Sequence, residues 1–279
     1  MTGHRPFTGK SIAMIFQKRS TRTRVSTEVA WNTLGGHAIY LGVNDIHLGV
    51  EESVGDTARV LSHMNDAILA RVYGHDDVVE MSQGSSVPVI NALSQTYHPL
   101  QALADQMILE ETFQARDLTG LEIAFVGDGN NISNSMAIMA ANMGCNFRIA
   151  SPKGYEVHSS VRAAVAAIAD RTGSRILYTN DPQEACKDAN VIATDTWISM
   201  GDEADAAKRL EAFAGYQVTE KMAAVAKPDW KFLHCLPRKK YEVDDDVFYN
   251  PKRSLVWDEA ENRMWTVMSV SLALLRGKL

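Results

Sequence analysis

The sequence has few cysteines, no long apolar run and no excess of positive charge, and each absence excludes a class of protein. Its 279 residues include only Cys145, Cys186 and Cys235, which form neither a CxxC pair nor a zinc-ligand spacing. We therefore expect free thiols in a reducing compartment and no metal site. No apolar stretch is long enough to span a bilayer, so we expect no membrane partner. The net charge of −6 argues against nucleic acid as a partner.

The N-terminal segment lacks the features of a targeting signal. Residues 1–9 contain no apolar core of the kind found in secretory signal peptides and are too short for a transit peptide. We expect a cytoplasmic protein, with the mitochondrial matrix as the alternative if the sequence is incomplete at its N-terminus. The chain has no short-period repeats, and its length allows one large or two modest domains.

Short apolar runs alternate with helical segments along the chain. Several runs are continuous rather than alternating, as in parallel strands that are covered on both faces. The alternation predicts right-handed βαβ crossovers and an α/β fold. The expected strands are Ser11–Phe16, Ala38–Leu41, Ala67–Val72, Val87–Ile90, Leu121–Val126, Phe147–Ala150, Ile176–Tyr178, Val191–Thr194, Trp230–Leu236 and Leu255–Trp257.

A polar break at residues 114–120 divides the pattern into two series. It follows a helical segment, His98–Phe113, and precedes a new βαβ series that starts at Leu121. We therefore predict two domains, 1–113 and 114–261, each with a parallel β-sheet flanked by helices in a Rossmann-like arrangement, joined by interdomain helices. The amphipathic segment after residue 261 has no strand behind it, and we expect residues 262–279 to pack back on the first domain.

A hydroxyl- and arginine-rich run follows the first expected strand. Residues 18–24 read Lys-Arg-Ser-Thr-Arg-Thr-Arg directly after the apolar run Ser11–Phe16, at the start of an amphipathic segment. The N-terminus of a helix attracts phosphate, and hydroxyl and guanidinium groups there add suitable donors. The alternative is a basic surface run or a nuclear-localisation-like patch. A strand directly in front favours the phosphate site.

Further polar clusters follow other expected strands. Because open α/β sheets bind ligands at the carboxyl ends of their strands, these clusters mark a candidate site. They are Arg71, His98–Gln101, Gly127–Asn131, Asp195–Gly201 and His234–Arg238. The Gly127–Asn131 stretch begins as a dinucleotide fingerprint does but lacks its third glycine, since position 132 is Ile132. We therefore expect no nicotinamide, and Asn131 better fits an amide that faces a polar ligand. The other clusters require no cofactor either.

Taken together, these motifs resemble those of the aspartate/ornithine carbamoyltransferase family. The matching motifs are Ser20-Thr-Arg-Thr-Arg24, His98-Pro-Leu-Gln101, Asp195 with Ser199-Met-Gly201, and His234-Cys-Leu-Pro237. They occur in order and with similar spacing over nearly the whole chain. The first two resemble the shared carbamoyl-phosphate site, and the last two resemble the ornithine-specific members.

The resemblance implies that carbamoyl phosphate donates its carbamoyl group to the δ-amine of L-ornithine. The implied carbamoyl-phosphate ligands are Ser20, Thr21, Arg22, Thr23, His47, Arg71, His98, Gln101, Cys235, Leu236 and Arg263. The implied ornithine ligands are Asn131, Asp195, Ser199 and Met200. Catalytic roles fall to Arg71, His98, Asp195 and Cys235. His47 resembles a loop residue that a neighbouring subunit supplies in a homotrimer, which is the partner that the resemblance implies.

The chain departs from the family pattern in front of Ser11. Family members carry further helical structure before the equivalent strand, whereas ten residues stand there in this sequence. Without that cover, we expect apolar surface of the first domain to be open to solvent. We therefore expect a chain that keeps the fold and is marginally stable.

Three other functions remain open at this point. One is carbamoyl transfer to another amine, such as putrescine or N-acetylornithine, and a second is a non-catalytic paralogue. A third is a hydrolase with Cys235 as nucleophile and His98 as base. The individual residues also have structural interpretations, because a histidine often caps a helix and a cysteine often packs as a small apolar side chain.

Overall fold

The computed structural model describes residues 5–46, 51–199 and 203–278, and the chain divides into two compact units. Unit 1 comprises residues 1–104 and 261–279, and unit 2 comprises residues 105–260. The division lies inside helix α4 (Pro99–Phe113), whereas the polar break at 114–120 places it after that helix.

Unit 1 is built on a parallel sheet in which, among the described residues, four strands pair in the order β2-β1-β3-β4. The helix α10 (Val256–Leu275) and the 3₁₀ turn η3 (Arg276–Lys278) return the chain to this unit. The other elements are β1 (Ser11–Phe16), α1 (Thr21–Thr33), β2 (His37–Gly42), α2 (Val54–Ser62), β3 (Ala67–Arg71), α3 (His75–Gly84) and β4 (Val89–Leu93).

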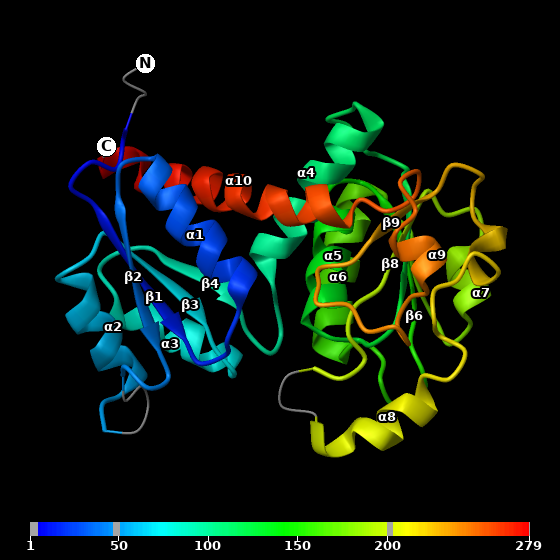
Figure 1. Ribbon diagram of the computed structural model, residues 1–279, viewed down its shortest axis with the longest axis horizontal. Helices are drawn as coiled ribbons and strands as arrows, with labels where there is room; N and C mark the ends of the chain where they lie inside the picture. Colours follow the sequence, from blue (N-terminus) through cyan, green and yellow to red (C-terminus); the bar gives the residue numbers. More distant parts are fainter. Residues whose placement is uncertain (1–4, 47–50, 200–202, 279) are drawn as a thin grey trace. The chain divides into compact units, whose positions relative to one another are not determined.

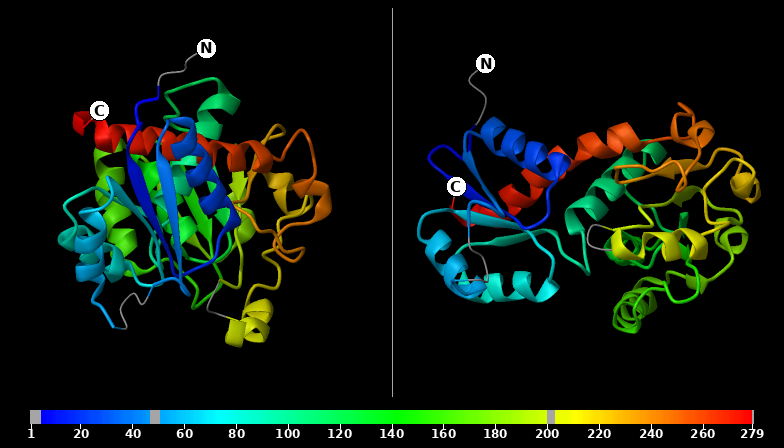
Figure 2. Two further views of the ribbon diagram at one scale, coloured as in Figure 1. Left: turned by 60° about the vertical axis from the view of Figure 1, so that its left-hand side comes forward. Right: turned by 60° about the horizontal axis from the view of Figure 1, so that its bottom comes forward.

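Helices cover both faces of this sheet (Figures 1 and 2). Successive side chains of a strand point to opposite faces, so alternate residues of β1 enter two different cores. Met14 packs in one core with Trp31 of α1 and with α10, and Ile15 packs in the other with α2 and Met81 of α3. The indole Nε1 of Trp31 also donates to Ser271 Oγ at 3.1 Å, which fixes α10 beside α1. The α/β prediction is confirmed for this unit.

Unit 2 contains a second parallel sheet, whose five strands in the described part of the chain follow the order β7-β6-β5-β8-β9. The end of α4 and the start of α10 belong to this unit. Its other elements are β5 (Glu122–Val126), α5 (Asn131–Asn142), β6 (Asn146–Ala150), α6 (Ser159–Thr172), β7 (Ile176–Thr179), α7 (Pro182–Cys186), β8 (Val191–Ala193), η1 (Glu203–Asp205), α8 (Ala206–Ala212), η2 (Met222–Val225), β9 (Lys231–Leu233) and α9 (Asp245–Phe248).

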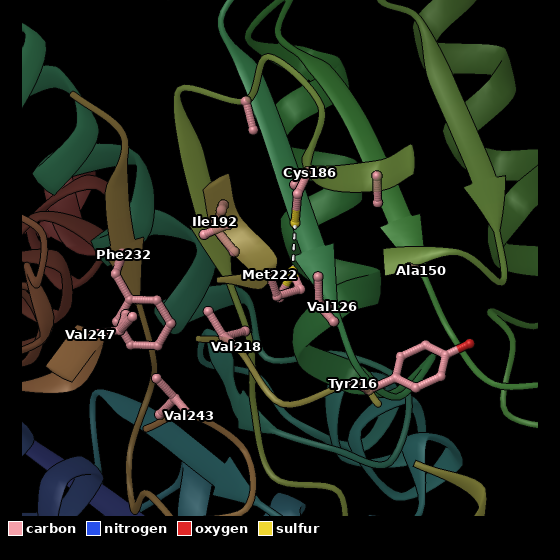
Figure 3. Close-up of a cluster of buried hydrophobic side chains, with 14 of the residues drawn as sticks. Val126, Ala150, Cys186, Ile192, Tyr216, Val218, Met222, Phe232, Val243 and Val247 are labelled. Atoms are coloured by element: carbon pink, nitrogen blue, oxygen red, sulfur yellow. Dashed lines mark hydrogen bonds between the residues drawn. The ribbon is translucent and has the colours of Figure 1, made fainter. Parts of the chain in front are cut away.

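One hydrophobic cluster of unit 2 lies against one face of that sheet (Figure 3). Val126, Ile192 and Phe232 come from three neighbouring strands, and Cys186 of α7 and Met222 of η2 pack over them. Burial of each large apolar side chain contributes about 1.5–3 kcal/mol. These strands are buried because helices and turns cover them, which explains their continuous apolar runs.

One expected strand is wrong. The run Leu255–Trp257 forms no strand, because α10 begins at Val256. The residue in front of the run, Ser254, makes an isolated bridge with Phe232. A run of three apolar residues does not distinguish a strand from the first turn of a helix. Asp258 and Glu259, which lie in the first turn of α10, favour a helix start because their charge complements the positive end of the helix dipole. Of the helices described, none is long and apolar enough to cross a membrane.

Candidate active site

Each sheet reverses its strand order at one point, where parallel α/β sheets bind ligands. In unit 1 the reversal lies between β1 and β3, and the chain after β1 runs into Ser20 while β3 ends at Arg71. In unit 2 it lies between β5 and β8, which lead into residues 127–131 and 195–199. The polar clusters predicted from the sequence therefore follow the strands at both reversal points.

The turn after β1 forms the capped start of α1. Ser20 is the N-cap, and its Oγ accepts a hydrogen bond from the backbone N–H of Thr23 at 3.2 Å. Thr21 is exposed, Arg22 is half-buried and Thr23 is buried. The positive end of the helix dipole and the hydroxyl groups make this turn suitable for an anion.

Two buried arginines lie in the same unit. Arg71 is the last residue of β3 and is paired in register with Phe16 of β1; its Nε donates to the carbonyl of Lys18 at 3.2 Å. Arg263 of α10 donates from Nη1 to Gln101 Oε1 at 2.8 Å and from Nη2 to Thr23 Oγ1 at 3.3 Å. The final helix thus reaches both the α1 turn and the start of α4.

His98, directly before α4, is surrounded by positive charge. It is buried, and burial lowers the pKa of its imidazole well below the usual 6.5; Arg263, Arg71 and Arg22 lower the pKa further. The imidazole is therefore neutral at pH 7. We call Arg22, Arg71 and Arg263 with His98 the arginine cluster; its three guanidinium groups make it suited to an anionic ligand.

A carboxylate lies at the corresponding point of unit 2. Asp195, after β8, is buried and accepts hydrogen bonds from Asn130 Nδ2 and from Cys235 Sγ, both at 3.0 Å. Asn130 is the N-cap of α5, where its Oδ1 accepts from the backbone N–H groups of Ile132 and Ser133. The amide oxygen of Asn130 thus caps α5 while its amide nitrogen holds the Asp195 carboxylate beside the start of that helix.

Cys235 is a protonated thiol in this environment. Burial raises its pKa well above the usual value, and the negative charges of Asp195, Glu259 and Asp105 raise the pKa further. A cysteine nucleophile needs the thiolate form, so this setting argues against the cysteine hydrolase. We call Asp195, Glu259 and Asp105 with Cys235 the carboxylate cluster; its charge suits a cationic ligand.

The backbone after Cys235 is held by a buried histidine. Leu236 has a φ of 60°, a region that residues other than glycine rarely adopt, and its N–H donates to His234 Nδ1 at 2.9 Å. Because Nδ1 accepts, Nε2 carries the proton and donates to Glu242 Oε2 at 3.1 Å. The carbonyl of Leu236 is thereby fixed by contacts of its own segment.

Within each unit, the structure brings together several of the residues predicted from sequence. Asn131 is half-buried at the start of α5. Asn130 beside it, which sequence reasoning did not assign to the site, donates to Asp195 Oδ2. An asparagine in front of a helix is a signal for the N-cap, and that signal marks position 130. Ser199 is half-buried in the loop after β8. His47 and Met200 lie outside the described residues. Within the residues that the structure describes, no group of three or more histidine, cysteine, aspartate or glutamate side chains is arranged for a metal ion.

Two family models match the chain, and together they cover most of it. Residues 2–111 match the carbamoyl-P binding domain of aspartate/ornithine carbamoyltransferase, and residues 119–274 match its Asp/Orn binding domain. Helix α10 contributes Arg263 to unit 1, although the second model extends to residue 274.

Curated proteins and solved structures give the same result. The chain is 54% identical over 267 residues to the mitochondrial ornithine carbamoyltransferase of Aquarana catesbeiana, a match that covers 96% of this chain and 75% of that protein. It is also 54% identical to the mitochondrial ornithine transcarbamylase of Gallus gallus, with the same coverage. The solved ornithine carbamoyltransferase of Pyrococcus furiosus superposes with a TM-score of 0.94 at 47% identity, covering 99% of this chain and 87% of that one.

Proposed function

Because this chain belongs to the aspartate/ornithine carbamoyltransferase family, we propose that it transfers the carbamoyl group of carbamoyl phosphate to the δ-amine of L-ornithine, giving L-citrulline and phosphate. The observation that carries the proposal is the opposite charge of the two clusters. The arginine cluster suits a phosphate ester, and the carboxylate cluster suits an alkylammonium group.

Carbamoyl phosphate binds in unit 1. The α1 turn and Arg22 hold its phosphate, and Arg71 bridges phosphate and carbonyl oxygens. His98 is neutral, so it donates to the carbamoyl oxygen without adding a further positive charge. Gln101 contacts the amide, with its own side chain oriented by Arg263.

L-Ornithine binds in unit 2. Asn131, Ser199 and Met200 hold its α-amino-acid end, and Asp195 and Cys235 lie near its δ-amine. The carbonyl of Leu236 accepts a hydrogen bond from the carbamoyl NH₂ group. The hydrogen bond from the Leu236 N–H to His234 orients this segment of the backbone.

The reaction needs a stabilised oxyanion and a deprotonated amine. Attack on the carbamoyl carbon forms a tetrahedral oxyanion, and Thr23, Arg71 and His98 supply preorganised donors for it. The leaving phosphate is stabilised by Arg22 and Arg71. An alkylamine with a pKa of about 10.4 must lose a proton before attack. Asp195 or a phosphate oxygen of the first substrate accepts that proton, whereas Cys235 stays protonated and serves as a hydrogen-bond donor.

One assay separates the candidate functions. The protein is mixed with carbamoyl phosphate and with ornithine, putrescine, N-acetylornithine or aspartate in turn, and phosphate release and the carbamoylated product are measured. We expect citrulline from ornithine and much slower turnover of the other amines. If another amine is carbamoylated and ornithine is not, that amine is the substrate. If none of them is carbamoylated, the result supports a non-catalytic paralogue.

Assembly and compartment are part of the proposal. We propose a homotrimer in which His47 acts at a neighbouring subunit, and sedimentation of the purified chain tests the trimer. The expected cytoplasmic location stays a prediction. The curated relatives compared above are named mitochondrial, which favours the mitochondrial matrix as the alternative. Fractionation of the source cells decides between the two compartments.

A further inference from the structure

Arg209 of α8 links the two loops that carry the ornithine ligands. Its Nη1 donates to Asp128 Oδ2 at 2.8 Å and to the carbonyl of Trp197 at 2.9 Å. Asp128 follows β5 in the turn that leads into Asn130 and Asn131. Trp197 stands between Asp195 and Ser199. A single guanidinium nitrogen has two N–H groups, so it satisfies both acceptors at once.

The contacts of Arg209 are well shielded from water. The side chains of Arg209 and Asp128 are only 15% and 10% exposed. The guanidinium also lies over the ring of Tyr155, 5.0 Å from its centroid. A hydrogen bond between charged groups gains strength when water is excluded. The link is therefore stronger than an exposed ion pair on the surface of a helix.

Arg209 gives α8, a helix with few buried side chains, a polar contact with the interior. None of the seven residues of α8 is fully buried, and of its apolar side chains only Ala212, directly before the buried Phe213, packs partly against the core. Trp197, by contrast, is packed, with its ring stacked on Phe213 at 5.3 Å and close to Tyr241 at 5.1 Å. Arg209 thus joins a helix with little apolar anchoring to a loop with a rigid centre.

We propose that Arg209 is a positioning residue for the amino-acid substrate, holding the turn at residues 127–131 and the loop at residues 195–199 in one fixed relation. The inference rests on the proposed function for its kinetic consequence. Both of these segments belong to unit 2, whereas the carbamoyl-phosphate ligands of the arginine cluster belong to unit 1. Loss of the link therefore weakens ornithine use and leaves the use of carbamoyl phosphate nearly unchanged.

The kinetic test uses Arg209→Met, Arg209→Lys and a control. Arg209→Met removes both hydrogen bonds while it keeps most of the side chain's apolar stem, and we expect KM for ornithine to rise about tenfold or more. KM for carbamoyl phosphate should stay within about twofold. Arg209→Lys keeps a positive donor and should recover part of the loss. The control is Arg175→Met, at the opposite edge of the same sheet, whose 78% exposed side chain pairs with Glu122; it should leave both KM values unchanged.

A second measurement is independent of turnover. Hydrogen exchange of the ligand-free protein should be faster in Arg209→Met over residues 127–131 and 195–199, and unchanged over β5 and β6. Equal exchange in wild type and Arg209→Met overturns the inference, as does an equal rise of both KM values. If wild type releases no citrulline, the proposed function fails, and the exchange result still decides whether Arg209 links the loops.

Discussion

The arginine cluster predicts that a phosphate-bearing ligand raises the melting temperature of the chain, and that Arg22 carries much of the effect. A ligand that binds only the folded state stabilises it by RT ln(1 + [L]/Kd), about 2.7 kcal/mol at 100 times Kd. For a domain of this size, that corresponds to a rise of about 5–10 °C. The expected ligand is carbamoyl phosphate, with inorganic phosphate as the stable substitute during heating.

The magnitude for Arg22→Met follows from its position at the α1 turn. A hydrogen bond to a charged group contributes about 1.5–3 kcal/mol, so its loss raises Kd about 10- to 150-fold. At the same ligand concentration, the stabilisation then falls to about 0.3–1.4 kcal/mol. Most of the rise in melting temperature should therefore disappear.

Arg24→Met is the matched control on the same helix. Arg24 lies two residues further along, is 48% exposed, and pairs outward with Glu28 at 2.8 Å. Its guanidinium also lies over Tyr40, away from the cluster partners of Arg22. The measurement is thermal unfolding by circular dichroism with increasing phosphate or carbamoyl phosphate. Loss of the ligand effect in Arg24→Met, or its full retention in Arg22→Met, refutes the assigned phosphate site.

Three further predictions follow from burial and charge. Cys235 should react slowly with iodoacetamide at pH 8, because burial and Asp195 keep it protonated; rapid labelling mapped to Cys235 by mass spectrometry contradicts this. The lowered pKa of His98 means that the unfolded chain takes up a proton below about pH 6.5 while the folded chain does not, so the free energy of unfolding should fall on acidification below that pH. In urea unfolding measured from pH 8 to 5.5, the free energy of unfolding should fall less with pH in His98→Gln than in wild type. An identical pH dependence in the two proteins argues against the buried neutral form. Phe213→Ala removes the buried ring under Trp197 and should cost about 3–5 kcal/mol in urea unfolding; a loss below about 1 kcal/mol contradicts the packing.

The sequence predicted the α/β architecture and the strand ends well, because buried parallel strands leave a direct record as continuous apolar runs. Ser20 and Arg71 were expected at the carboxyl ends of β1 and β3, where the structure has them. Leu255–Trp257 was misassigned because three apolar residues suit either a strand or the first turn of a helix. Such patterns do not predict contacts between residues that are far apart in the sequence.

The link between Arg209 and Asp128 illustrates that limit. The two residues are 81 positions apart, and Arg209 is part of no recognisable motif. The role of Asn130 was missed for a different reason. The interpretation considered Asn131 as a ligand residue and did not recognise Asn130 as the N-cap of α5, which also donates to Asp195. Sequence patterns predict strand ends, but they do not say which distant side chains meet there.

The divided composition of unit 1 has a consequence for synthesis on the ribosome. Residues 105–260 form one continuous stretch, so unit 2 has all of its strands before the last part of the chain emerges. Unit 1 needs α10, because Trp31 and Thr23 bond to Ser271 and Arg263, each 240 positions later. Domains of growing chains generally fold from the N-terminus onward. Here the first-made strands must wait for the last-made helix, so the N-terminal half depends longest on protection against aggregation.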